Sequence, residues 1–326
     1  QAKAKARLLD RLVKTLDKPF EHGGGALNVL RRGFKEHPAQ FAMCEFRPAD
    51  SMNEAVLERY SRVRLRVMRQ VHYSKHNTNS IDLVFFVNGI PVATSEVKTT
   101  FTQSVGDAIE QYKTDRLPQS PGKGAEPLLS VGRRALVHFA VDNDEVWMTT
   151  RLAGAKTRFL PFNKGNDGHQ GNPVNPHGSR TSYLWEETLS KDVWLTIIGK
   201  FMHLQVTESV NPVTEVKERR ESLLFPRYHQ YQAVTQLVET ARSEGAGKKY
   251  LIQHSAGSGK TNSIAWLAHR LSSLHDAQDE KMFDSVVVIT DRTVLDDQLQ
   301  EAIFQIDHKQ GMVVPIGDRI KTGTTG

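Results

Sequence analysis

Residues 80–98 read Ser-Ile-Asp-Leu-Val-Phe-Phe-Val-Asn-Gly-Ile-Pro-Val-Ala-Thr-Ser-Glu-Val-Lys, and this stretch decides the fold expected for the first part of the chain. The apolar run 81–87 predicts a strand, and residues 91–98 predict the strand that returns beside it. Asn88-Gly89 between the two runs is the strongest short signal for a β-hairpin. The stretch therefore predicts two antiparallel strands joined by a tight turn.

Three charged residues of this hairpin form a candidate catalytic group. Asp82 lies on the first strand, and Glu96 and Lys98 lie two residues apart on the second, where alternate side chains share a face. Two carboxylates can hold Mg²⁺, which polarises a phosphate and activates an attacking water that a lysine can orient. The group therefore fits metal-dependent phosphodiester hydrolysis. The alternative is a surface hairpin that carries three solvated charges.

The spacing of these residues raises a question of register. A strict two-residue loop at Asn88-Gly89 pairs Asp82 with Ser95, which turns Glu96 to the opposite face. A three-residue loop or one β-bulge brings Glu96 to the face of Asp82. We therefore predict an odd loop or a bulge in this hairpin. We also expect Val97 to face away from its charged neighbours, toward a core.

Residues 256–261 read Ala-Gly-Ser-Gly-Lys-Thr, after an apolar stretch expected as a strand (250–253) and before an expected helix (261–274). This is the context of a phosphate-binding loop, in which backbone N–H groups and a helix N-terminus surround phosphates. A structural glycine turn is the alternative. The complete pattern would have a glycine in place of His254. The candidate nucleotide-binding residues are Gly257, Ser258, Gly259, Lys260 for the β- and γ-phosphates, and Thr261 for Mg²⁺.

The other patterns predict an α/β protein of two domains. Helices are expected at 1–20, 102–115 and 185–203, strands at 136–140 and 145–149, and a long loop at 161–181. From Tyr228 onward helices alternate with strands, including a strand at 285–290 and a helix at 294–304, which indicates a parallel sheet. The expected domains are 1–210, a connector at 211–224, and 225–326.

Composition narrows the classes of protein. The 326 residues suffice for about two domains, and 43 basic against 37 acidic residues give a net charge of +6, which suits a polyanionic partner. The single cysteine, Cys44, excludes an intrachain disulfide and a CxxC zinc site. No run of about 20 apolar residues is present, so no membrane contact is expected.

The hairpin resembles the PD-(D/E)xK nuclease superfamily, and the chain more closely resembles the restriction (R) subunit of type I restriction–modification enzymes. The resemblance implies that Asp82 and Glu96 hold the metal and that Lys98 assists the water. It also implies a role for Gln111, although Asp115 stands where the family motif has a tyrosine and Tyr112 comes earlier. An upstream helix can add Glu54 or Glu58. The matching stretches are 71–74, 79–92, 95–98, 159–165 and 171–173.

Residues 255–261 are similar to the first motif of superfamily 2 helicases. Residues 226–233 resemble the Q motif, which makes Gln230 the residue that reads adenine, and residues 289–298 resemble a motif in which Thr290 and Arg292 meet the nucleic-acid backbone. The resemblance implies a RecA-like lobe, truncated at Gly326 before the acidic motif that would complete it. It also implies ATP and Mg²⁺ as cofactors.

The implied protein is a type I site-specific deoxyribonuclease, which translocates double-stranded DNA with ATP and cuts it with Mg²⁺. Its implied partners are methyltransferase and specificity subunits, in the cytoplasm of a bacterium or archaeon. Two alternatives stay open: a helicase–nuclease of DNA repair or another phage-defence system, and a non-catalytic, nucleotide-gated DNA-binding scaffold. Arg62, Arg64 and Arg66 alternate as on a strand and either line a phosphate backbone or form a solvated face.

Overall fold

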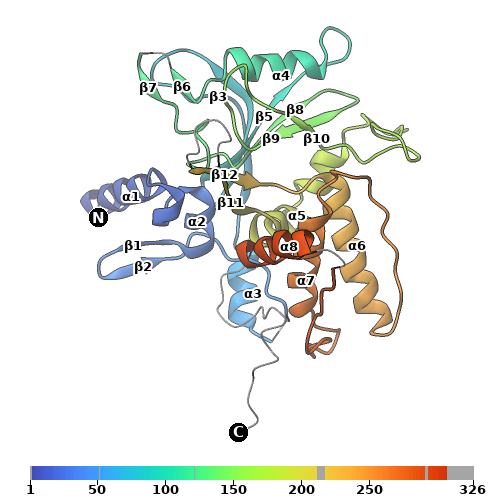
Figure 1. Ribbon diagram of the computed structural model, residues 1–326. Helices are drawn as coiled ribbons and strands as arrows, with labels where there is room; N and C mark the ends of the chain where they lie inside the picture. Colours follow the sequence, from blue (N-terminus) through green and yellow to red (C-terminus); the bar gives the residue numbers. More distant parts are fainter. Residues whose placement is uncertain (1, 51, 121, 211–216, 291–292, 307–326) are drawn as a thin grey trace. The chain divides into compact units, whose positions relative to one another are not determined.

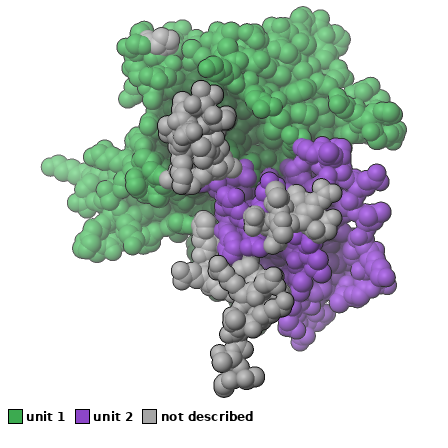
Figure 2. Space-filling view, viewed as in Figure 1, with its two compact units in different colours: residues 1–202, 222–229 green, residues 203–221, 230–326 purple. Residues whose placement is uncertain are grey.

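The computed structural model describes all residues except 1, 51, 121, 211–216, 291–292 and 307–326 (Figure 1). The chain divides into two compact units (Figure 2). The first comprises residues 1–202 with 222–229, and the second comprises residues 203–221 with 230–326. Six residues of the expected connector, 211–216, lie outside the described part of the chain.

The first unit is built on a mixed six-stranded sheet in the order β10-β9-β8-β5-β4-β3. The strands β5 and β8 run parallel, and every other neighbouring pair is antiparallel. Helix α4 (Val105–Thr114) connects the two parallel strands, as a crossover connection requires. The strands are β3 (Leu65–His72), β4 (Ser80–Val87), β5 (Ile90–Val97), β8 (Val137–Val141), β9 (Val146–Thr149) and β10 (Leu160–Pro161).

The hairpin β4–β5 confirms the predicted bulge. Its turn has two residues, Asn88 and Gly89, both with positive φ (48° and 86°), as a type I′ turn requires. Phe86 pairs with Pro91, but Phe85 pairs with Ala93, so the second strand carries one extra residue. Beyond the bulge Leu83 pairs with Ser95, and the next step of the ladder sets Asp82 opposite Glu96.

The sheet is covered on both faces at β8, whose successive residues point to opposite sides. On one face Ala140 packs with Ala108 and Tyr112 of α4. On the other, Phe139 is surrounded by aromatic rings, with centroids 5.9–6.4 Å from those of Phe162, Trp194 and Phe225. Burial on both faces gives β8 an uninterrupted buried run.

The remaining elements of the first unit lie around this sheet. The expected loop 161–181 contains no helix, and it is fixed by Asn172, whose amide donates to the Asp144 carbonyl at 2.8 Å. Residues 42–49, whose sequence pattern indicates an extended segment, take part in no strand ladder. The elements are α1 (Ala2–Leu16), η1 (Phe20–His22), α2 (Gly25–Arg32), β1 (Phe34–Glu36), β2 (Ala39–Phe41), α3 (Glu54–Ser61), β6 (Gln119–Ser120), β7 (Gly124–Ala125), η2 (Leu184–Thr188), α5 (Lys191–Thr196) and η3 (Ile197–Phe201).

The second unit consists mainly of helices. Ala265 of α7 packs against Leu299, Ala302 and Ile303 of α8. Strand β11 pairs with β12, whose last residues belong to the first unit. The elements are β11 (His203–Val210), β12 (Lys217–Leu224), α6 (Tyr228–Glu244), α7 (Lys260–Ser272) and α8 (Thr293–Ile306).

The strands expected at 250–253 and 285–290 are wrong for the described residues. Neither segment takes part in a ladder, so the predicted parallel sheet is not formed there. A strand exists only where its N–H and C=O groups are paired with a neighbour. Leu251 and Ile289 correspondingly remain 93% and 86% exposed.

No helix among the described residues is long and apolar enough to cross a membrane.

Candidate nuclease and nucleotide sites

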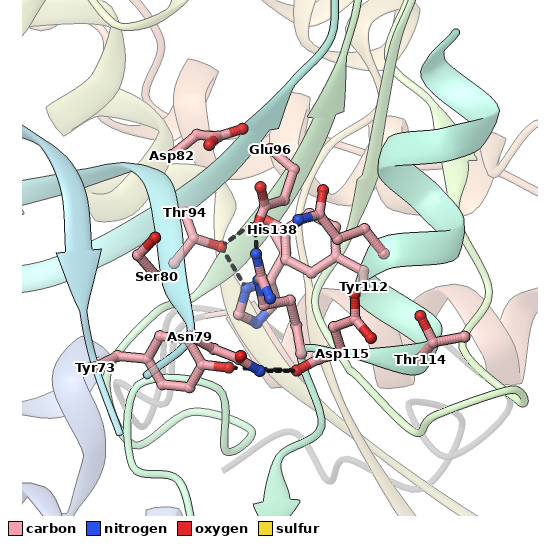
Figure 3. Close-up of polar contacts among 12 residues, drawn as sticks. Tyr73, Asn79, Ser80, Asp82, Thr94, Glu96, Tyr112, Thr114, Asp115 and His138 are labelled. Carbon is pink, nitrogen blue, oxygen red and sulfur yellow. Dashed lines mark hydrogen bonds and ion pairs between the residues drawn. The ribbon is translucent and has the colours of Figure 1, made fainter. Parts of the chain in front are cut away.

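The β4–β5 ladder brings Asp82 and Glu96 together, and Figure 3 shows the two carboxylates side by side. The two faces of β5 at this point differ from the expectation that Val97 would face a core. Val97 is 39% exposed, while Glu96 is completely buried. The strand ends at Val97, where coverage by neighbouring elements ends, so the apolar residue meets solvent and the acidic residue points inward.

Asp82 is held by neighbouring strands. Its Oδ2 accepts a hydrogen bond from the backbone N–H of Val97 at 2.9 Å, and its Oδ1 accepts one from Gln70 Nε2 at 2.9 Å. The Gln70 side chain is in turn fixed by Ser80, whose hydroxyl donates to Gln70 Oε1 at 2.9 Å. Gln70 has a φ of 50°, an unfavourable left-handed conformation for a residue with a side chain.

Glu96 is a buried carboxylate with one strong partner. Arg116, just after α4, donates from Nε to Glu96 Oε1 at 2.6 Å, with side-chain exposures of 8% for Arg116 and 0% for Glu96. Oε2 is buried and accepts no hydrogen bond from any described residue. Burial raises the pKa of Glu96 to about 7; Arg116 acts in the opposite direction, and Asp82 raises the pKa further.

Lys98 and Gln111 are joined directly. Lys98 Nζ donates to Gln111 Oε1 at 2.7 Å, so α4 fixes the position of the ammonium. The helix itself begins at a capping box formed by Ser104 and Asp107. The backbone and the side chain of Ser104 lower the pKa of Asp107. Of the four residues expected in the nuclease site, Asp82 lies on β4, Glu96 at the end of β5, Lys98 directly after β5 and Gln111 on α4.

The donor set fits a magnesium ion. Mg²⁺ commonly takes one or two carboxylates from the protein and completes its shell with water and substrate phosphates. Asp82 and Glu96 supply two carboxylates, and the unpartnered Glu96 Oε2 is an anionic oxygen that a cation would satisfy. The described residues contain no cluster of three or more His, Cys, Asp or Glu, so no larger protein cage is available.

Tyr112 belongs to the core. Its hydroxyl lies 2.8 Å from Thr94 Oγ1, which lies 2.7 Å from His138 Nδ1, and all three residues are buried (Figure 3). Burial raises the pKa of Tyr112 well above its usual value and lowers that of His138 to about 3. His138 is consequently neutral at physiological pH.

The upstream acidic candidates lie apart from the carboxylate pair. Glu54 and Glu58 are exposed on α3, and Glu58 forms an ion pair with Arg62 one turn later. Among the described residues neither contacts Asp82 or Glu96. Arg62 is the C-cap of α3 and Arg64 precedes β3, so of the three arginines expected to alternate on a strand only Arg66 lies on one.

The glycine-rich loop has the backbone of a phosphate cradle. Gly257 and Gly259 have φ values of 73° and 83°, and Gly259 is the N-cap of α7. Lys260 Nζ donates to the carbonyls of His254 and Ser255 at 3.0 and 2.9 Å, which brings the ammonium back over the loop. Thr261 lies in the first turn of α7.

Gln230 supports this loop from behind. Its Nε2 donates to the carbonyls of Ser258 and Gly259 at 3.1 and 2.9 Å, and the residue is 4% exposed. A Cβ on Gly259 would lie 2.4 Å from that nitrogen, so the Gln230 side chain would have to shift to admit any other residue. Thr290 is the last residue of the unpaired segment 285–290, and Arg292 lies outside the described residues.

Two residues that contact the carboxylate pair were not found from the sequence. Arg116 lies 20 positions after its carboxylate, and Gln70 lies on a strand whose exposed pattern carries no sign of a buried contact. A completely buried glutamate needs a cationic or hydrogen-bonding partner, so knowledge that Glu96 is buried would have pointed to a residue such as Arg116. The sequence did not show that Glu96 would be buried.

Comparisons with known proteins find two separate matches along the chain. Residues 57–157 match the family model described as type I restriction enzyme R protein N terminus, and residues 229–320 match the model of the SWI2/SNF2 ATPase. A protein of Methanocaldococcus jannaschii described as "Putative type I restriction enzyme MjaVIIIP endonuclease subunit" is 23% identical over 266 residues. The alignment covers 78% of this chain and 23% of that relative.

The fold and the matches define the class: a mixed α/β nuclease-type domain followed by an ATPase segment. More particularly, the chain is similar to the N-terminal region of the R proteins of type I restriction enzymes, as the resemblance predicted.

Proposed function

We propose that this chain is the nuclease domain and the beginning of the motor of a type I restriction subunit, a site-specific deoxyribonuclease. The nuclease domain, of PD-(D/E)xK type, spans 1–210. The connector spans 211–224, and residues 225–326 begin a RecA-like lobe. The substrate is double-stranded DNA, Mg²⁺ and ATP are the cofactors, and methyltransferase and specificity subunits are the partners.

One observation carries the proposal: the bulged hairpin sets Asp82 opposite Glu96, and Gln111 holds the ammonium of Lys98, two residues after Glu96. An isolated Asp and Glu-x-Lys on a surface hairpin would not need this support. Here the hydrogen bonds to Val97 N–H and Gln70, and the burial of Glu96, fix both carboxylates before any substrate arrives. Such preorganisation is what an active site requires.

Each residue has a role in this reading. Asp82 and Glu96 hold the metal, which when bound polarises the scissile phosphate and lowers the pKa of the attacking water. Lys98 donates to that water or to the phosphate oxygens, and Gln111 keeps its ammonium in place. In the ATPase segment Gly257, Ser258 and Gly259 surround the phosphates, Lys260 neutralises them, Thr261 contacts the Mg²⁺ of the nucleotide, and Gln230 reads the adenine.

The test is plasmid cleavage by the full-length protein assembled with its methyltransferase and specificity partners. We expect wild type to cut only with Mg²⁺ and ATP. Lys98→Ala should reduce cutting by at least about 100-fold and retain ATP hydrolysis, because it removes a charge that acts only in the nuclease transition state. Lys260→Ala should remove both activities.

Lys35→Ala, an exposed lysine on β1, is the matched control and should cut as wild type does. If Lys98→Ala cuts as well as this control, the Asp82–Glu96–Lys98 group is not the nuclease site. If wild type binds DNA but never cuts it, the non-catalytic scaffold is the better reading. Cutting that needs no methyltransferase or specificity subunit would favour a helicase–nuclease of repair or of another defence system.

A further inference from the structure

The ion pair between Arg116 and Glu96 distinguishes the two oxygens of a single carboxylate. Oε1 accepts from Arg116 Nε at 2.6 Å, while Oε2 is buried without a hydrogen-bond partner among the described residues. A free carboxylate can rotate and exchange its oxygens, but a buried one with a guanidinium fixed on one oxygen cannot do so without breaking the bond. The carboxylate is therefore held in one orientation.

Arg116 is itself held in place. Its backbone N–H donates to the Gln111 carbonyl at 3.2 Å at the end of α4, and its side chain is 8% exposed. Gln111 also accepts from Lys98 on its side chain, so the same turn of the chain fixes the lysine and the arginine. The end of α4 thus fixes two cationic side chains: the Lys98 ammonium on Gln111 Oε1 and the Arg116 guanidinium on Glu96 Oε1.

We propose that Arg116 is a positioning residue of the nuclease site, which holds Glu96 Oε1 so that Oε2 is the oxygen presented to the metal. This inference rests on the proposed function and deepens it. A purely structural ion pair would use both carboxylate oxygens, because a buried charge is stabilised only when its remaining lone pairs are satisfied. Here one oxygen is left for a ligand.

The test measures binding of Mn²⁺, used as the probe for the metal, by electron paramagnetic resonance on the nucleotide-free chain. Three variants grade the contact: Arg116→Lys keeps a cation that reaches Oε1, Arg116→Gln keeps a neutral donor, and Arg116→Met keeps neither. We expect Arg116→Lys to bind within about threefold of wild type, and Arg116→Met to bind at least about 10-fold more weakly, with Arg116→Gln between them.

Arg134→Met is the matched control, because the Arg134 side chain is also mostly buried (12% exposed) and forms an ion pair, with Asp17 at 2.9 Å, outside the carboxylate site. It should lower thermal stability without changing Mn²⁺ affinity. If Arg116→Met binds Mn²⁺ as tightly as wild type, Arg116 does not position the ligand. Should Arg116→Met fail to fold, equal affinities of Arg116→Gln and Arg116→Lys would overturn the inference in the same way.

Asp82→Asn separates this failure from failure of the proposed function. Asp82→Asn should lose Mn²⁺ binding if the carboxylate pair is the metal site. If it binds as wild type does, the proposed site is wrong whatever the arginine variants show. If it loses binding while the three arginine variants keep wild-type affinity, only the role of Arg116 is wrong.

Discussion

The two candidate sites are built in opposite ways. The nuclease site consists of side chains whose positions are set by a ladder of paired strands, by α4 and by burial. The nucleotide site consists mainly of backbone, in a glycine turn before α7, supported by a single buried glutamine. The first site depends on a complete core, whereas the second depends on a few φ angles. Substitutions should therefore damage the two sites by different routes.

The largest expected effect tests the dependence on the core. Phe139→Ala should lower the free energy of unfolding of the first unit by about 3–5 kcal/mol, because it opens a cavity among Phe162, Trp194 and Phe225. Affinity for a fluorescent ATP analogue should be unchanged. Urea unfolding and nucleotide titration measure the two quantities, and Phe101→Ala, at a 93% exposed position, is the control. An equal loss of nucleotide affinity would show that the sites are not independent.

The second test uses pH. Burial lowers the pKa of His138 to about 3, below its usual 6.5, so the folded state excludes a proton that the unfolded state takes up. The contribution of neutral His138 to the free energy of unfolding is therefore fully present above about pH 6.5. It is lost as the pH falls toward 3, and the loss is on the order of 3 kcal/mol. Unfolding free energies from pH 7 to 4 should fall less steeply in His138→Gln than in wild type. His72→Gln, an exposed histidine, should keep the wild-type slope.

The third test compares two glycines of the nucleotide loop. Gly259→Ala should weaken nucleotide binding by at least about 10-fold, because its Cβ would lie 2.4 Å from Gln230 Nε2. Gly257→Ala has nothing within 4 Å and should cost only about 1 kcal/mol of backbone strain. Titration with a fluorescent ATP analogue separates them. Equal effects would mean that Gln230 does not press against the loop.

The smallest expected effect distinguishes a core tyrosine from a catalytic one. Tyr112→Phe removes the hydroxyl beside Thr94 and should cost about 1 kcal/mol of stability. Cleavage by the assembled enzyme should stay within about threefold of wild type, since Tyr112 lies in the core. A loss of cleavage without a loss of stability would return Tyr112 to the site.

The sequence predicted what local pairing controls. The hairpin, its bulge, α4 and the placement of Asp82 opposite Glu96 all follow from residues within about 30 positions of one another. It did not predict Arg116 or Gln70, because their contacts depend on where an entire helix end and a kinked strand meet the hairpin. The strands expected near Leu251 and Ile289 failed for a related reason: an apolar pattern supplies no pairing partner.

Because of the bulge, the two strands of the hairpin should differ in how well they tolerate the loss of a residue. Between the turn and the carboxylate pair, β5 carries one residue more than β4. Loss of one residue from that part of β5 would leave a regular ladder, with Asp82 still opposite Glu96. Loss of one residue from β4 between Asp82 and the turn would shift the register, so that Asp82 would no longer lie opposite Glu96. Deletions compatible with an intact site should therefore accumulate on the second strand and spare the first.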